Sequence, residues 1–238
     1  MPGVSAGCCG SKRSAVADAG DDDVFLSGQD LSASRERFRK PQAIDEIRRR
    51  ILPLARGDVL EIGVGPGVNF PYYNPATVSK LYGLEPNSGM LRRAEEQRRK
   101  TQLEIEFLDL PGERIPLADA SVDTVVSTFT LCIIPGVVEA IRGIGRILKP
   151  NGKFIFFEHG LAPDSAVQSW QRRTEPLFRW AFEGCHVTRH IPTLISEGGF
   201  TIENIEAGYL APFPKSGSYT WWGVAVPSSG TQAKINVI

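Results

Sequence analysis

The 238-residue sequence predicts an α/β fold, a doubly wound seven-stranded sheet that is mostly parallel and has an antiparallel C-terminal hairpin strand. Two observations lead to this fold. From about residue 34 to residue 158, short apolar runs alternate with segments of helical periodicity, which indicates parallel strands with helices on both faces. Two late β segments are then joined by a loop rather than a helix, which predicts an antiparallel pair at one edge.

The expected helices follow from apolar spacing and from breakers. The first, 34–54, carries apolar residues at helical spacing and precedes the first strand. Only a short helix can follow that strand, because 70–75 contains two prolines. Further helices are expected at 88–101 and at 137–148, where a turn with Pro150 ends the second of them.

Seven short apolar segments are expected to form the strands, all within one domain. In chain order they are 58–62, 80–84, 103–108, 122–128, 153–158, 200–206 and 219–226. The domain is expected to span 24–227. Residues 1–23 are rich in Gly, Ser, Ala and Asp and are expected to be a disordered tail, and 228–238 a flexible C-terminal tail.

Composition excludes several classes of function. Lysine plus arginine equals aspartate plus glutamate at 27 each, with no one-sided basic footprint, so we expect no nucleic-acid partner. No apolar run reaches about 18 residues, so no integral membrane segment is expected. Four unevenly spaced cysteines indicate a reducing, cytoplasmic setting with neither a disulfide framework nor a metal. The sequence leaves the oligomeric state open, and we assume a monomer.

The most informative motif is Val-Leu-Glu-Ile-Gly-Val-Gly-Pro-Gly at 59–67. Its glycines, Gly63, Gly65 and Gly67, can adopt backbone angles that bring a ligand against main-chain N–H groups. Glu85, at the end of the next strand, can accept both hydroxyls of a ribose. The spacing departs from that of dinucleotide enzymes, so no pyrophosphate is expected, and Glu61 suits a positive sulfonium.

These residues resemble the class I S-adenosylmethionine-dependent methyltransferases, which have a Rossmann-like fold. The resemblance extends over about 38–226, where 119–126 and 148–153 look like the stretches before the fourth and fifth strands of the family. It implies S-adenosyl-L-methionine as cofactor, S-adenosyl-L-homocysteine as product, and no metal. A glycine-rich turn in another kind of α/β protein is the alternative.

The resemblance also implies where the cofactor is held. The methionine and ribose parts of the cofactor would contact the glycine motif, and the ribose hydroxyls would contact Glu85. The adenine would contact the segments after the second and third strands. Pro111 stands where many relatives have aspartate, so the contact to the adenine amine is left open. The expected cofactor-binding residues are Glu61, Gly63, Gly65, Gly67, Glu85, Pro86, Gly112, Glu113 and Thr128.

A narrower resemblance concerns the methyl acceptor. Segments 127–132, 156–159 and 182–189 look like the methyltransferase-like alkyl-thiol S-methyltransferases of animals and their bacterial relatives. This implies S-methylation of a small-molecule thiol by in-line displacement. The animal proteins begin with a membrane-associating apolar helix that this sequence lacks, so we do not carry over their membrane location.

A thiol acceptor must become a thiolate, which a nearby base or cation assists, because its pKa lies near 8.5 or above. His159, expected at the carboxyl end of the fifth strand, is the first catalytic candidate, and Arg189 and His186 come second, with His190. A histidine that only orients a loop is the alternative for the first of these.

Aromatic residues after the fifth strand are expected to line an apolar cap over the acceptor. The alternative for each ring is simple packing of the outer helix onto the sheet. The expected substrate-binding residues are Thr130, Cys132, Trp180, Tyr209 and Trp221. For the function itself two alternatives stay open, an O-, N- or C-methyltransferase of an aromatic or lipid-like metabolite and a non-catalytic S-adenosylmethionine-binding protein.

Overall fold

The computed structural model describes residues 44–210 and 212–228. The expected tail at 1–23, the first part of the helix expected at 34–54 and nearly all of the tail expected at 228–238 lie outside the described residues. No helix in the described ranges combines the length and the apolar character needed to cross a membrane.

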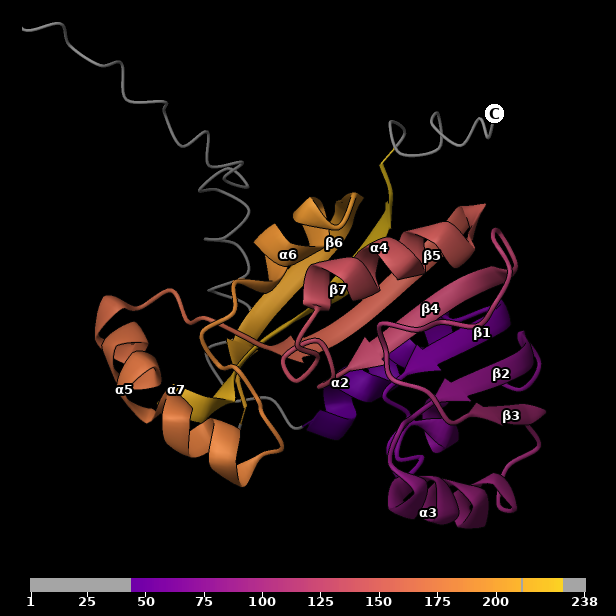
Figure 1. Ribbon diagram of the computed structural model, residues 1–238, viewed down its shortest axis with the longest axis horizontal. Coiled ribbons are helices and arrows are strands. Elements are labelled where there is room, and N and C mark those ends of the chain that lie inside the picture. The colour runs from indigo at the N-terminus through magenta and orange to yellow at the C-terminus, as the bar shows by residue number, and fades with distance from the viewer. Residues whose placement is uncertain (1–43, 211, 229–238) are drawn as a thin grey trace, which may run out of the picture.

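The described chain folds into one mixed sheet of seven strands in the order β3-β2-β1-β4-β5-β7-β6 (Figure 1). The first five strands are parallel, and β7 runs antiparallel to both of its neighbours. This confirms the predicted fold class. The strands are β1 Gly57–Ile62, β2 Val78–Leu84, β3 Ile105–Leu108, β4 Val122–Thr128, β5 Leu148–His159, β6 Phe200–Tyr209 and β7 Tyr219–Pro227.

Helices cover both faces of the sheet, and α5 and α7 lie to its left in Figure 1, past the arrowheads of β4 and β5. Helices α4 and α6 pack on one face, and α2 and α3 on the other. The helices are α2 Ile44–Ile51, α3 Ser88–Arg98, α4 Val137–Ile147, α5 Ser165–Ala181, α6 Ile191–Glu197 and α7 Lys215–Ser218, with 3-10 turns at Leu52–Leu54 and Phe70–Tyr72.

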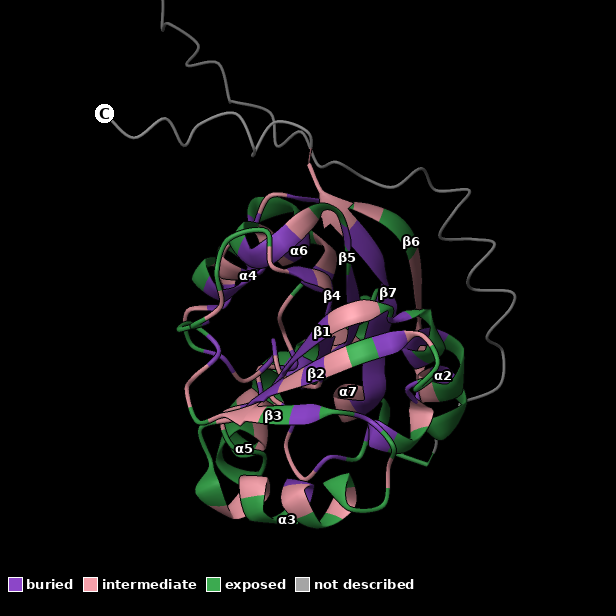
Figure 2. Cartoon of the chain, turned by 90° about the vertical axis from the view of Figure 1, so that its right-hand side faces the viewer, coloured by how far each residue is buried: buried purple, intermediate pink, exposed green. Residues whose placement is uncertain are grey.

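The central strands are largely buried (Figure 2), and most of their buried side chains are apolar, as expected for a sheet covered on both faces. In β5, Phe154 and Phe156 face the layer of α4 and α6, whereas Ile155 and Phe157 face the layer of α2 and α3. All four side chains are 0% exposed. Burial of an apolar side chain of this size contributes roughly 1.5 to 3 kcal/mol, so this strand anchors both layers.

The start of β5 and the hairpin connection differ from the prediction. Strand β5 begins at Leu148 rather than at residue 153, because this buried leucine pairs with Val122 across a bulge and Lys149 donates from Nζ to Asp123 at 2.7 Å. No bounds were predicted for α5 and α6, and the hairpin connection, which was predicted to be a loop, contains the one-turn helix α7. The remaining elements differ from their expected bounds only by small shifts at their ends.

Candidate functional site

The glycine motif forms a loop at the carboxyl end of β1. Gly63, Gly65 and Gly67 have φ of +67°, +52° and +77°, in the left-handed region that favours glycine. A Cβ on Gly63 would collide with the side chain of Thr130, whereas a Cβ on Gly65 would meet nothing closer than a carbonyl oxygen 4.0 Å away. Gly65 therefore presents its backbone to open space, as a ligand cradle requires.

Glu85 follows β2 and lies against this loop. Its carboxylate accepts from the backbone N–H of Gly65 at 3.1 Å and from that of Asn87 at 3.0 Å. Asn87 in turn caps α3, since its Oδ1 accepts from the N–H of Gly89 at 2.9 Å. These bonds leave further lone pairs on the carboxylate, which is only partly buried. The structure thus brings together two groups that the sequence predicted to share one ligand.

Glu61 is held inside the protein. The side chain is 1% exposed, and its two oxygens accept from Asn69 Nδ2 at 2.7 Å and from the Tyr73 hydroxyl at 2.8 Å. Burial raises its pKa to about 7, against the opposing effect of these two hydrogen bonds. Asn69 also donates to Thr128 Oγ1 at 2.8 Å, so this network ties the glycine loop to the end of β4.

The segment after β4 turns sharply beside the glycine loop. Phe129 has φ of +54°, uncommon for a residue with a side chain, and packs against His159 with the ring centroids 4.6 Å apart and the rings tilted by 45°. Thr130 donates its N–H to the buried Glu158 carboxylate at 3.1 Å, and Ser127 donates its hydroxyl at 2.6 Å. Burial raises the pKa of Glu158 to about 7.

Two cysteines and a histidine meet at the carboxyl ends of β4 and β5. Cys132 Sγ, Cys185 Sγ and one His159 ring nitrogen lie within 4.8 Å of one another, and the Cys185 Sγ to His159 Nδ1 distance is 3.8 Å. Both thiols are buried. The hydrogen bond with Cys132 and the neighbouring His159 lower the pKa of Cys185, while the same pairing and burial raise that of Cys132.

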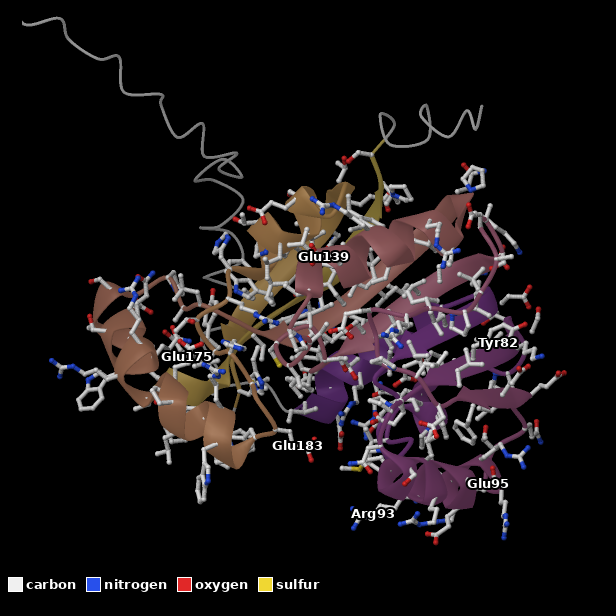
Figure 3. All side chains as sticks on the ribbon, in the orientation of Figure 1. Tyr82, Arg93, Glu95, Glu139, Glu175 and Glu183 are labelled. Carbon is white, nitrogen blue, oxygen red and sulfur yellow. The ribbon has the colours of Figure 1, made fainter. Side chains whose placement is uncertain are left out.

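The other two catalytic candidates have partners within the protein. His186 Nδ1 lies 2.8 Å from the Glu175 carboxylate, which comes from the inner side of α5 (Figure 3). The Arg189 guanidinium donates to the backbone carbonyls of Leu131 and Ile134, the latter at 2.8 Å. Both residues therefore hold the loops around the cysteine–histidine cluster.

The segments expected near adenine lie at the same edge of the sheet. Pro86 is exposed directly after Glu85. Gly112 is buried, and a Cβ there would approach Ile134 Cδ1 to 2.7 Å, so a larger residue would require this side chain to move. Glu113 is exposed, with the N–H of Gly136 at 3.4 Å from its carboxylate.

The aromatic residues expected in a cap do not form one continuous lining. Trp180 is 83% exposed on the outer side of α5. Trp221 is buried in β7 and donates from Nε1 to the carbonyl of Leu161 at 3.3 Å, and the Tyr209 hydroxyl donates to Asp164 at 2.7 Å. The rings of Tyr209 and Trp221 thus pack the outer segments onto the sheet, and Trp180 does not join them.

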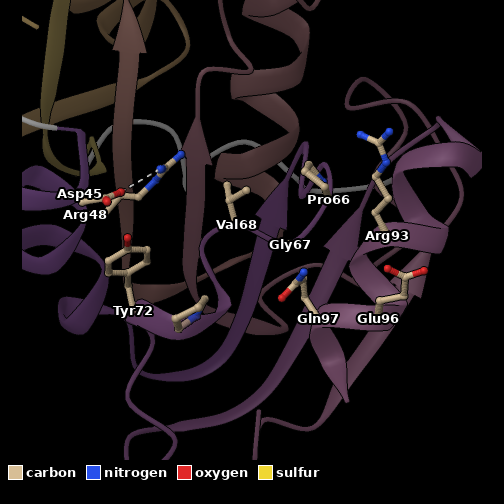
Figure 4. A pocket seen from close by; sticks show the side chains of 10 residues that line it. Asp45, Arg48, Pro66, Gly67, Val68, Tyr72, Arg93, Glu96 and Gln97 are labelled. Carbon is tan, nitrogen blue, oxygen red and sulfur yellow. Dashed lines mark ion pairs between the residues drawn. The ribbon is translucent and has the colours of Figure 1, made fainter. Parts of the chain in front are cut away.

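A groove of about 520 Å³ lies beside the end of the glycine loop, between α2 and α3 (Figure 4). It shares only Gly67 with the predicted cofactor residues, and an ion pair of 3.5 Å between Arg48 and Asp45 borders it. Its remaining lining includes charged side chains of α3, Arg93 and Glu96 among them. Glu85 and the other two glycines of the motif, Gly63 and Gly65, do not line this groove.

Sequence reasoning missed several residues that build the site. Asn69 and Tyr73 carry no motif and fix Glu61 only through the fold. Gln171, 0% exposed on α5, donates from Nε2 to the carbonyls of Gly160 and Val187, each at 3.0 Å, which joins the end of β5 to the Cys185 loop. No local pattern signals such a buried glutamine.

Comparison with known proteins adds family information to this geometry. The family model described as a methyltransferase domain matches residues 60–156. Thiol S-methyltransferase TMT1B of Rattus norvegicus is 34% identical over 153 residues, which are 62% of this chain and 62% of the rat protein. Thiol S-methyltransferase TMT1A of Homo sapiens is 30% identical over 192 residues, which are 77% of this chain and 75% of the human protein.

Among solved structures, the YcgJ protein of Bacillus subtilis has the same fold. It superimposes with a TM-score of 0.59 at 15% identity, over 74% of this chain and 94% of the other. At that identity the likeness concerns the fold. The family match over 60–156, by contrast, is a match of sequence and includes the glycine loop, Glu85 and the end of β4.

Proposed function

Since the chain belongs to the class I S-adenosylmethionine-dependent methyltransferases, we propose that it transfers the methyl group of S-adenosylmethionine to the sulfur of a small-molecule thiol. The observation that carries the proposal is the 30% identity over three quarters of a thiol S-methyltransferase. One fold hosts many acceptors, so the acceptor is argued from relatives and site chemistry and not from fold.

The donor would be held by the loop after β1 and the residue after β2. Gly65 offers an unobstructed backbone, and Glu85, positioned by two N–H groups, offers a carboxylate to the ribose hydroxyls. Glu61 would act from behind the loop, because both of its oxygens already accept hydrogen bonds from within the protein. The bound donor supplies an electrophilic methyl on a sulfonium.

The acceptor would lie past the ends of β4 and β5. Methyl transfer is an in-line displacement, so holding the acceptor sulfur behind the methyl carbon contributes much of the rate. This edge carries Thr130 against the glycine loop and, two residues further on, Cys132. It also carries Cys185 and His159, the groups placed to assist loss of the acceptor's proton.

An acceptor panel tests the proposal. Thiols from hydrogen sulfide and mercaptoethanol to bulky aromatic thiols are compared with a phenol and an amine, with donor carrying a deuterated methyl group. Mass spectrometry of the product and release of S-adenosylhomocysteine are the readouts. Labelled thioethers are expected. Turnover of the phenol or amine without any labelled thioether would reject a thiol acceptor, and donor binding without turnover of any acceptor would favour a non-catalytic protein.

A further inference from the structure

The cysteine–histidine cluster, Cys132, His159 and Cys185, has the composition of a metal site. Each residue offers one soft or borderline ligand atom, and these atoms lie within 4.8 Å of one another. They come from three elements far apart in sequence, the loop after β4, the end of β5 and the loop after α5. Spacing along the chain therefore gives no sign of the cluster, and no metal was expected from the sequence.

The distances suit tetrahedral zinc. With zinc–sulfur distances of about 2.3 Å and zinc–nitrogen distances of about 2.0 to 2.1 Å, neighbouring ligands lie about 3.5 to 3.8 Å apart. The Cys185 Sγ to His159 Nδ1 distance is 3.8 Å, and the cluster as a whole needs only a small contraction. Three protein ligands with a fourth position open is the arrangement of catalytic rather than structural zinc.

We propose that Cys132, His159 and Cys185 bind one Zn²⁺ ion and that its fourth position takes the sulfur of the methyl acceptor. The first half of the proposal, zinc binding, is argued from the ligand geometry alone. The second half, binding of the acceptor sulfur to the ion, rests on the proposed function. Two thiolates and one neutral imidazole neutralise the charge of the ion, which suits a site where both sulfur ligands are buried.

The surrounding contacts hold the three ligands in place. The backbone N–H of His186 donates to the Cys132 carbonyl at 2.8 Å, which joins the two cysteine loops. Arg189 fixes the segment around Cys132 through the carbonyls on either side of it. Phe129 packs against the imidazole of His159. A site held in this way loses little conformational entropy when it binds the ion.

The cluster lies beside the predicted donor loop. Thr130, two residues before Cys132, is the side chain that fills the space above Gly63. Phe178 of α5 packs against the cluster from the outer side. An acceptor sulfur on the ion would thus be shielded by α5 and face the edge of the sheet where the donor is expected.

Coordination would supply the thiolate that methylation needs. The acceptor thiol binds the ion through sulfur and releases its proton to water, because a coordinating thiol is deprotonated. Its sulfur then forms a bond to the methyl carbon, the bond from that carbon to the donor sulfur breaks, and that electron pair stays on the donor sulfur. The thioether product is neutral and a weaker ligand than a thiolate, so it leaves.

Metal content of the full chain tests the first half. We expect about one zinc per chain after purification under reducing conditions, and a cobalt-thiolate absorption band when Co²⁺ is added to the metal-free protein. Cys132→Ser, Cys185→Ser and His159→Ala should each weaken Co²⁺ binding at least about tenfold. Circular dichroism checks that each variant is folded.

Two control variants bind metal as the wild type does if the assignment is right. Cys8→Ser combined with Cys9→Ser removes the other two cysteines of the chain. His190→Ala removes an exposed histidine outside the cluster. Wild-type protein with neither zinc nor a cobalt-thiolate band overturns the proposal, as does a disulfide between Cys132 and Cys185 in the reduced preparation. Either result is obtained without an activity assay.

Addition of an acceptor thiol tests the second half. A shift of the cobalt band on adding mercaptoethanol, and loss of thiol turnover on removing the metal, are expected. Unchanged thiol methylation by metal-free protein would show that the ion does not bind the acceptor sulfur for catalysis, and would leave the proposed function intact. Metal binding with turnover of hydroxyl acceptors alone overturns the thiol-binding role together with the proposed function, while the metal site itself stands.

Discussion

Replacement of Glu61 by glutamine should change how stability depends on pH. The carboxyl group is 1% exposed and has a pKa raised by burial from 4.5 to about 7. Glutamine has the same shape, its oxygen can still accept from Asn69, and its amide can donate to the Tyr73 hydroxyl, which also accepts. The substitution therefore removes the ionisation and keeps the network.

The direction follows from proton binding. Between pH 4.5 and about 7 the folded protein keeps a proton on Glu61 that the unfolded chain has lost. The contribution of this group to the free energy of unfolding is thus fully present below pH 4.5 and is lost as the pH rises through about 7. The loss amounts to about 3 kcal/mol, since one pKa unit corresponds to about 1.4 kcal/mol.

The assay is urea unfolding at about pH 5 and about pH 8, with the free energy of unfolding as readout. Glu158 titrates similarly in both proteins, so the difference between wild type and Glu61→Gln isolates one group. The wild type should lose up to about 3 kcal/mol more stability over this range. Glu139→Gln, an exposed carboxylate on α4, is the control. Equal losses in wild type and Glu61→Gln, within about 0.5 kcal/mol, would refute the reasoning.

Five further substitutions give separate expectations. Glu85→Ala should weaken donor binding at least about tenfold in calorimetric titration, because the hydrogen bonds from the two ribose hydroxyls to a charged carboxylate are lost. Unchanged affinity would show that the ribose does not bind at Glu85. Gly63→Ala should destabilise the protein by more than about 2 kcal/mol through a steric clash, and Gly65→Ala by only about 1 kcal/mol while reducing donor affinity more; the reverse order would contradict the cradle. Gln171→Ala should cost about 2 to 4 kcal/mol in urea unfolding, since buried carbonyls lose their donors, and a cost below about 1 kcal/mol would rule out that role. Trp180→Ala should leave stability within about 0.5 kcal/mol of the wild type in the same assay, and a larger loss would show that this ring packs against the protein.

The sheet and the glycine loop were predictable because their signals are local. An apolar strand followed by Gly63, Gly65 and Gly67 can hardly form anything but a strand and a tight loop, and all three have the expected positive φ. Glu85 was predictable for the same reason, since parallel strands bring their carboxyl ends to one edge. The structure accordingly joins Gly65 to Glu85 by a hydrogen bond.

The outer region was harder to predict because α5 inverts the usual pattern of burial. Its inner side carries Gln171 and Glu175, which bond to backbone and side-chain groups of the following loop, while Trp180 points outward. Helical apolar periodicity marks the buried side of most helices. Here polar contacts decide the orientation, so an aromatic residue expected in a substrate cap lies on the surface.

The cysteine–histidine cluster depends entirely on tertiary structure. From the sequence, Cys132 is expected only as a substrate contact, and no role is predicted for Cys185. Only the fold shows that both thiols meet His159. Long-range proximity of this kind cannot be read from spacing, because it depends on how β4, β5 and the loop after α5 pack.

The most direct test of the central claim is the ratio of methyl transfer to mercaptoethanol and to ethylene glycol under identical conditions. Mercaptoethanol has a thiol where ethylene glycol has a second hydroxyl, so the ratio reports selectivity for sulfur over oxygen as the acceptor atom. We predict labelled thioether and no labelled ether. Labelled ether formed as fast as the thioether, or in its place, would contradict a thiol S-methyltransferase.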